Sequence, residues 1–384
     1  MSKGKVSGRN RFSRNVIYLG LTSMVNDISS EMISPVLPIF LMNLGASSIV
    51  IGLVSGSRKF FASALEFVSG YAVDRLGKRK PFIYAGYLTS SLSKFLLAFS
   101  RTWPVALVLT SLDRVGKGVR TPARDAIVAE SMPRAHGKGF GIHRALDTFG
   151  AVIGSTLALI LIWQFSLSPG TILLIAGAIS LFSLIPLLRV REPIPHKFRK
   201  KDNHPVSKRF KLFVIVSFVF ALANFSYMFF LLGVKDMLGS EVLSTAYYVL
   251  FNVVYALLAK PMGELSDRYG RKRVLVFGYS VFGLSCLTFI LAFLTVNNVF
   301  FLIIPFVLYG VANAVVNANQ RAFVSDLTDQ NTRGAAFGIY HGVTSISALP
   351  SGLIAGQLWS INPIYTFVWG AAFSSLAALL LFKV

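Results

Sequence analysis

The chain has 384 residues, of which 54% are hydrophobic and only 14% are charged, and its formal net charge is +22. Soluble domains carry about 25% charged residues, so this composition excludes an ordinary soluble protein and indicates several membrane-spanning helices. Nucleic-acid binding would require the basic residues to form one patch. They fall instead in the short segments between apolar runs, as the positive-inside rule predicts. We therefore expect an all-α membrane protein that binds no nucleic acid.

Six apolar runs occupy the first half of the chain. Residues 1–14 carry five basic side chains and no acidic one, which predicts a cytoplasmic N-terminus. The segments between the following runs alternate between basic and nearly uncharged. We predict an N-terminal six-helix bundle over residues 15–188, with spans at about 15–42, 49–70, 81–100, 105–131, 139–163 and 170–188.

The longest polar segment covers residues 189–211 and holds nine Lys or Arg against two acids, Glu192 and Asp202. Its three prolines disfavour a continuous helix, so we expect a cytoplasmic linker that lies on the anionic inner leaflet. A C-terminal six-helix bundle is predicted over 212–384, with spans at about 212–234, 243–263, 274–295, 298–325, 335–358 and 362–382. Twelve spans place both termini in the cytoplasm.

A charged stretch between spans 2 and 3, Gly70 to Lys80, returns as Gly263 to Arg273 with an offset of 193 residues. A repeat at half the chain length is typical of a duplicated transporter, and its inner glycine allows a tight turn. A second repeat relates residues 139–143 to 336–340. The candidate gating residues are Gly70, Asp74, Arg75, Gly77 and Arg79 in the first copy and Gly263, Asp267, Arg268, Gly270 and Arg271 in the second.

The pattern Gly-x-x-x-Asp-Arg-x-Gly-Arg/Lys-Arg/Lys resembles the loop signature of the major facilitator superfamily between spans 2 and 3 and between spans 8 and 9. The segments Asn26–Met32 and Asp113–Ala126 are similar to a bacterial and archaeal permease subgroup. Arg114-x-x-Lys117-Gly118 resembles the span-4 pattern Arg-x-x-Gln-Gly, whose Arg is associated with proton coupling; here Lys117 stands in place of Gln. The resemblance implies a transporter that works by alternating access, without enzymatic activity.

Charged residues within the spans are costly in a bilayer, so each is expected to face a cavity or a partner. Asp27 and Glu31 lie one helical turn apart, and two carboxylates this close in a low dielectric cannot both ionise cheaply. This arrangement suits a proton-carrying site or a divalent-cation site, or else ion pairs with basic residues of spans 2 or 4. His143 and Asp147, also one turn apart, predict either a proton relay or a structural histidine. The candidates for proton coupling are Asp27, Glu31, Asp113, Arg114, His143 and Asp147.

Span 4 carries Asp113, Lys117, Arg120 and Arg124 at three- and four-residue spacing, which predicts one polar face toward the interior. Lys94 of span 3 is expected to extend toward the membrane surface. The second half carries mostly neutral amides, which either bind substrate or join helices. The candidates for substrate binding are Arg58, Lys117, Arg120, Asn224, Asn252, Asn313 and Asn317.

These observations favour proton-coupled efflux of an anionic or amphiphilic organic compound across the cytoplasmic membrane, because the interior charges of the first half are net basic. An alternative is a divalent metal cation exporter that uses Asp27, Glu31 and His143. A membrane receptor on a transporter fold is a third hypothesis. We expect a monomer in the lipid bilayer whose partners are a small-molecule substrate and protons, without a cofactor or a resident metal ion.

Overall fold

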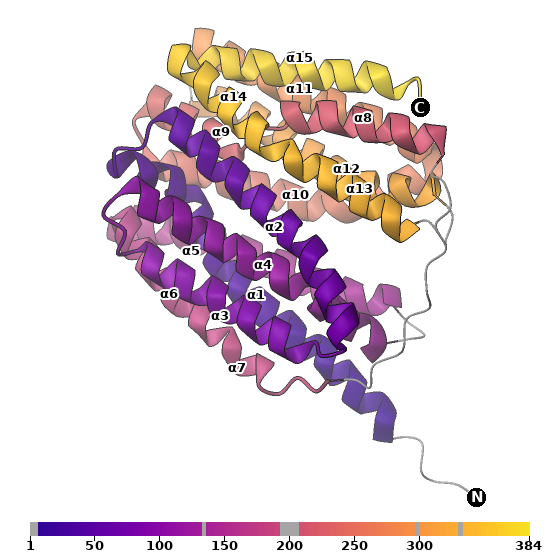
Figure 1. Cartoon of the computed structure of the whole chain (residues 1–384). Coiled ribbons are helices and arrows are strands. Elements are labelled where there is room, and N and C mark those ends of the chain that lie inside the picture. Colours follow the sequence, from indigo (N-terminus) through magenta and orange to yellow (C-terminus); the bar gives the residue numbers. More distant parts are fainter. Residues whose placement is uncertain (1–6, 133–135, 193–206, 296–298, 329–332) are drawn as a thin grey trace, which may run out of the picture. The chain divides into compact units, whose positions relative to one another are not determined.

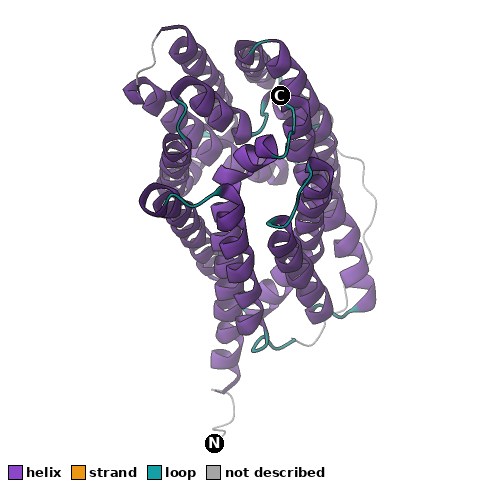
Figure 2. Cartoon of the chain, turned by 90° about the vertical axis from the view of Figure 1, so that its left-hand side faces the viewer, coloured by secondary structure: helices purple, strands orange, loops and turns teal. Residues whose placement is uncertain are grey.

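The structure is a computed structural model that describes residues 7–132, 136–192, 207–295, 299–328 and 333–384, without the side chains of 7–13, 74, 136–138, 318 and 333–335. Within these ranges the chain is helical and contains no strand (Figure 2). The prediction of an all-α protein is therefore confirmed for the described part of the chain.

Eight stretches of the described chain are long and apolar enough to cross a membrane. They are Ser48–Val73, Gly139–Phe165, Pro169–Leu187, Lys208–Leu238, Glu241–Tyr269, Arg271–Thr295, Val299–Asp326 and Pro363–Leu381. Helix α4 (Trp103–Ser131) has spanning length but is more polar, because its sequence carries seven charged residues. Length and hydropathy alone therefore establish a polytopic membrane protein, while the full number of twelve spans remains a prediction.

The chain divides into two compact units, one of residues 1–40 with 61–198 and the other of residues 41–60 with 199–384. The boundary at residue 198 falls in the predicted linker 189–211, of which residues 193–206 lie outside the described part. The helices of the first unit (labelled in Figure 1) are α1 (Ser7–Asn43), the later part of α2 (Ser48–Leu76), α3 (Lys80–Leu97), α4, α5 (His136–Phe165), α6 (Pro169–Phe182) and α7 (Leu184–Leu187).

Glycines bring the helices of the first unit into close contact. A Cβ at Gly116 of α4 would lie 2.5 Å from the carbonyl oxygen of Gly86 of α3. On α5, a Cβ at Gly154 would lie 2.2 Å from the carbonyl oxygen of Ile28 of α1. Small residues allow membrane helices to approach in this way. As a result, polar side chains on α1, α3 and α4 come within hydrogen-bonding distance of one another.

In the described residues of the second unit, the first part of α2 is joined by eight further α-helices and one short 3-10 helix. They are α8 (Lys208–Ala223), α9 (Tyr227–Leu238), α10 (Glu241–Tyr269), α11 (Arg271–Thr295), η1 (Val299–Leu302), α12 (Ile303–Asp326), α13 (Arg333–Ile346), α14 (Ala348–Ile361) and α15 (Pro363–Leu381). Its core is aromatic: the ring of Phe367 stacks on Phe289 at 4.4 Å between centroids and meets Phe230 edge-on at 5.0 Å. Such pairs add about 0.5–1.5 kcal/mol each beyond the area that they bury.

Two predicted spans of the second half are each divided into two helices. The seventh breaks between α8 and α9, around Asn224, and the eleventh breaks at Ser347 between α13 and α14. The carbonyl oxygen of Leu222, released near the first break, accepts hydrogen bonds from Ser351 Oγ at 3.0 Å and Trp369 Nε1 at 3.1 Å. Side chains of neighbouring helices thus satisfy backbone groups that the break exposes.

Candidate functional site

The residues of the polar face predicted for α4 differ in how deeply they are buried. Asp113 and Arg120 are 7% and 3% exposed, whereas Lys117 between them is exposed. Arg124 is half-buried. Only part of the stripe therefore lies against other helices, and Lys117 is an exposed residue in the middle of the helix.

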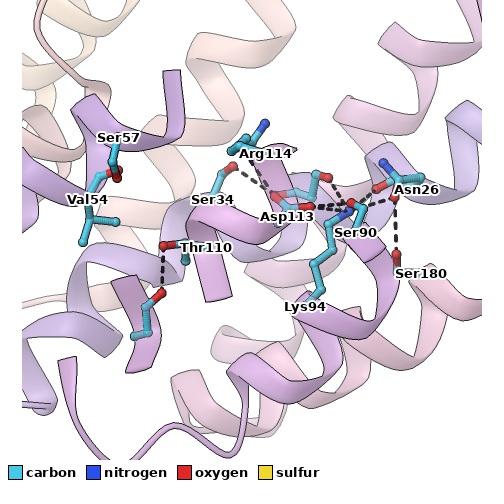
Figure 3. Close-up of polar contacts among 12 residues, drawn as sticks. Asn26, Ser34, Val54, Ser57, Ser90, Lys94, Thr110, Asp113, Arg114 and Ser180 are labelled. Carbon is cyan, nitrogen blue, oxygen red and sulfur yellow. Dashed lines mark hydrogen bonds and ion pairs between the residues drawn. The ribbon is translucent and has the colours of Figure 1, made fainter. Parts of the chain in front are cut away.

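Lys94 of α3 forms the centre of a buried polar cluster (Figure 3). Its ammonium group donates to the Asn26 backbone oxygen at 3.2 Å, to Asn26 Oδ1 at 2.9 Å and to Ser30 Oγ at 2.7 Å. Asp113 Oδ1 lies 3.8 Å from the same nitrogen. The expectation that Lys94 extends to the membrane surface is therefore wrong. Three acceptors match the three ammonium protons, and the nearby carboxylate balances the charge.

Asp113 is held by more than Lys94. Ser90 of α3 donates a hydrogen bond to its Oδ1, and Arg114 Nε lies 3.3 Å from its Oδ2. Ser180 of α6 completes the cluster by donating to Asn26 Oδ1 at 3.3 Å. The cluster therefore joins α1, α3, α4 and α6 around one lysine and one aspartate.

Arg120, two turns after Asp113, has a different environment. Its guanidinium lies over the ring of Tyr87 of α3 at 4.2 Å from the centroid. Nε and Nη1 are buried and have no hydrogen-bond partner among the residues that the structure describes. Unpaired buried donors are uncommon, and each needs a structural or functional explanation such as a ligand or an ordered water. Arg120 is thus a buried cation with unused capacity to bind an anion.

A second ionisable cluster connects α5 with α1 and α4, because Asp147 interacts with Ser23 and Arg124. His143 Nδ1 lies 3.4 Å from Asp147 Oδ2, and His143 is 5% exposed. Arg124 of α4 donates from Nη1 to Ser23 Oγ at 3.3 Å and pairs with Asp125 at 2.9 Å. The predicted meeting of His143 and Asp147 one turn apart is confirmed by this distance, while its role stays a prediction.

The two acids of α1 are half-buried. Asp27 lies near enough to Lys94 and Lys117 to attract both of them electrostatically. It follows Asn26, and Glu31 follows Ser30, so the acids lie about 100° around the helix from the two residues that hold Lys94. Asn26, Ser30 and Ser90 were not among the predicted site residues. Asn26 and Ser30 lie four residues apart on one face of α1, and this spacing was the signal that could have indicated a partner for Lys94.

The amides predicted to bind substrate occupy several environments in the second unit. Asn224 lies at the break after α8, Asn252 of α10 is 7% exposed, and Asn317 of α12 is exposed. Asn313 Nδ2 donates to the Tyr309 backbone oxygen of its own helix at 2.9 Å. Arg58, in the first part of α2, is 7% exposed. Among the described residues of both units, no three His, Cys, Asp or Glu side chains are grouped as a metal ion would require.

The two copies of the repeated loop adopt the predicted turn. Gly77 and Gly270 have φ of +64° and +90°, in the region that favours glycine. In the first copy the buried Arg79 pairs with Glu130 at the end of α4. In the second, Arg271 Nη2 lies 3.0 Å from Asp267 and its Nε lies 2.6 Å from Asp326 at the end of α12.

The remaining loop positions vary. Arg75 and Arg268 are exposed, and a Cβ at Gly70 would meet Pro122 at 3.7 Å, whereas one at Gly263 would meet nothing within 4 Å. The side chain of Asp74 lies outside the described part of the chain. Each loop thus connects to the end of a later helix through an arginine, although Arg79 and Arg271 do not occupy equivalent positions of the repeat.

A helical membrane protein with ionisable side chains inside its helices and a half-length repeat has the features of a secondary transporter. The profile of the Major Facilitator Superfamily matches residues 19–252 and 213–384. An uncharacterised MFS-type transporter of Methanocaldococcus jannaschii is 44% identical over 380 residues, which cover 96% of this chain and 94% of the relative. The chain therefore belongs to the Major Facilitator Superfamily, whose members are transporters and not enzymes.

More distant relatives have named activities. The multidrug resistance protein MdtH of Salmonella arizonae is 25% identical over 331 residues, covering 84% of this chain and 80% of MdtH. The crystal structure of a single-residue mutant of the nucleoside transporter NupG is similar with a TM-score of 0.80 at 17% identity, over 96% of this chain and 99% of that one. The likeness to NupG concerns the fold alone.

Proposed function

We propose that this transporter exports an anionic or amphiphilic organic compound in exchange for protons. The observation that carries the proposal is Arg120, a buried guanidinium with two donor nitrogens that have no partner in the described chain. An unpaired buried donor costs about 1–3 kcal/mol, and an oxygen of a carboxylate, sulfonate or phosphate can accept a hydrogen bond from either of these nitrogens. Lys117, exposed one turn earlier, adds a second positive charge.

The proton-coupling part of the proposal uses the acids and the histidine of the first unit. Histidine is a common proton carrier in proteins, and His143 contacts Asp147. Asp27 and Asp113 are further candidates, because protonation of either carboxylate changes the charge that faces Lys94. Glu31 and Arg114 are proposed from their positions in the sequence. The amides Asn224, Asn252, Asn313 and Asn317 and the buried Arg58 are proposed to bind neutral parts of the substrate.

The proposed architecture has twelve spans in two six-helix halves, residues 15–188 and 212–384, which rock about a site near the membrane midplane. The repeated loops would gate this motion on the cytoplasmic side. Both termini are proposed to lie on the same side, because basic segments between spans favour the cytoplasm. We propose a monomer in the cytoplasmic membrane. The relationship to a multidrug resistance protein supports efflux over uptake.

The test uses purified full-length protein in proteoliposomes with an imposed pH gradient. A panel of aromatic carboxylates and sulfonates is first screened by thermal shift, and the flux of any stabilising compound is then measured. Arg120→Gln is expected to lower the initial rate at least about tenfold, since a charged hydrogen bond contributes about 1.5–3 kcal/mol. Arg101→Gln, which alters an exposed arginine in a turn, serves as the matched control.

The alternative of a divalent metal cation exporter is tested in the same vesicles. Flux of labelled Zn²⁺ or Mn²⁺ driven by the pH gradient, with no organic anion transported, would overturn the proposal. The charges near Asp27 argue against this outcome, because Lys94 and Lys117 repel a bare cation.

A further inference from the structure

The first unit contains a basic cavity at the start of α3 and just after α7, away from the buried clusters described above. It has a volume of about 630 Å³ and is lined by Arg14, Asn15, Tyr18, Lys80 and residues 188–192. Four of these side chains are cationic, namely Arg14, Lys80, Arg189 and Arg191, against the single acid Glu192. Its size falls in the range of small-ligand sites, roughly 300–1,000 Å³.

The wall that carries two of the arginines is anchored on both sides. Asn15 Nδ2 donates to the Arg191 backbone oxygen at 2.8 Å, and the Arg191 N–H donates to Asn15 Oδ1 at 3.0 Å. Val190 is 1% exposed and packs in the hydrophobic core with Val16 and Leu187. The backbone that presents Arg189 and Arg191 is therefore fixed before any ligand arrives.

The one acid of the cavity is already engaged. The Glu192 carboxylate accepts hydrogen bonds from the backbone N–H groups of Arg79 and Lys80, the latter at 3.4 Å, at the start of α3. No ion pair of the described chain involves Arg14, Lys80, Arg189 or Arg191. Like charges around one cavity repel one another, so a bound anion would stabilise this arrangement.

The surroundings of the cavity indicate where such an anion comes from. Leu188 lines the cavity and is 67% exposed, and the exposed Ile185 and Phe182 continue an apolar surface along α7 and α6. In a membrane protein an exposed apolar surface of this kind faces acyl chains. A molecule with a phosphate group and an acyl chain can therefore contact the cations and this surface together.

We propose that the basic cavity binds the phosphate group of an anionic membrane lipid, with an acyl chain along Leu188, Ile185 and Phe182. Arginine pairs with phosphate through two parallel hydrogen bonds, and basic pockets on the cytoplasmic side of membrane helices select anionic headgroups. The lipid would join α1 and α3 to the first residues of the linker. This site is independent of the proposed substrate and of proton coupling.

The experiment measures lipid retention by native mass spectrometry and the unfolding midpoint of the purified full-length protein in detergent. Phosphatidylglycerol and phosphatidylcholine with identical acyl chains are compared. We expect phosphatidylglycerol to be retained and to raise the midpoint, and the double variant Arg189→Gln/Arg191→Gln to weaken its binding at least about tenfold. The matched control Lys208→Gln/Arg209→Gln removes two exposed basic residues at the start of α8 and is expected to bind as the wild type does.

Each of the following outcomes would overturn the proposal. Equal retention of phosphatidylcholine would show that binding does not require an anionic headgroup. An equal loss of phosphatidylglycerol binding in Lys208→Gln/Arg209→Gln would show that any basic residue of the protein attracts the lipid. If millimolar inorganic phosphate raises the unfolding midpoint as much as phosphatidylglycerol does, the cavity binds a soluble anion and not a lipid. If the first double variant is itself unstable without lipid, Arg14→Gln/Lys80→Gln tests the opposite wall, and unchanged lipid binding there refutes the site.

Discussion

The ion pair between Lys94 and Asp113 leads to a quantitative prediction about stability. Two unit charges 3.8 Å apart attract by roughly 4 kcal/mol at an effective dielectric constant of about 20. Removing one partner of a buried pair typically costs about 3–5 kcal/mol, because the other charge is left uncompensated. Lys94→Met and Asp113→Asn are each expected to destabilise the protein by about this amount.

The double variant Lys94→Met/Asp113→Asn removes both charges together. Its cost is expected to be smaller than the sum of the single costs by about 2 kcal/mol, half of the pair attraction, because Arg114 at 3.3 Å shares the Asp113 carboxylate. The loss of hydrogen bonds to Asn26 and Ser30 remains in every variant that lacks Lys94. The double variant therefore stays less stable than the wild type.

The measurement is a double-mutant cycle by denaturant titration in mixed micelles, followed by tryptophan fluorescence. Lys235→Met and Glu241→Gln provide the matched cycle, since this pair has a shorter distance, 2.9 Å, but side chains that are 23% and 33% exposed. Its coupling is expected to be below about 1 kcal/mol, because water reaches these half-buried side chains and weakens their attraction. Additive single costs at Lys94 and Asp113, within about 0.5 kcal/mol, would refute the reasoning.

Two further predictions concern close packing and the repeated loops. Gly352→Ala is expected to lower the free energy of unfolding by about 1–3 kcal/mol, because the added Cβ would lie 2.2 Å from the Gly52 carbonyl oxygen. Gly342→Ala is the control, since a Cβ at that position would have no atom within 4 Å. Equal unfolding midpoints of the two variants would contradict the prediction. Arg79→Gln is expected to cost about 3 kcal/mol and Arg271→Gln less than about 1 kcal/mol, because the arginine side chains are 5% and 26% exposed. Denaturant midpoints check this order, and a larger loss for Arg271→Gln would reverse it.

Much of the fold follows from local sequence. Apolar runs of spanning length predict membrane helices, and the half-length repeat predicts the duplicated loops. Gly77 and Gly270 take up positive φ as the turn requires. The spacing of His143 and Asp147 was enough to predict their contact, because residues four apart share a helix face whatever surrounds the helix.

The helix breaks were not visible in the apolar pattern. The seventh and eleventh spans were each predicted as one continuous helix. In the structure each consists of two helices, separated around Asn224 in the seventh span and at Ser347 in the eleventh. The Leu222 carbonyl near the first break finds donors on α14 and α15, far along the chain. A break inside a membrane is tolerated only where such partners exist, and their presence depends on packing.

Residue patterns along the chain were enough to predict the family, the helical class and the faces on which charged residues lie. The burial of Lys94 against Asn26, Ser30 and Asp113, and the exposure of Lys117 on the same helix as Arg120, depend instead on how the helices pack. Helical periodicity fixes the direction of a side chain relative to its own helix. Which helix lies opposite, and how closely, depends on contacts such as that between Gly86 and Gly116, which join residues distant in the chain.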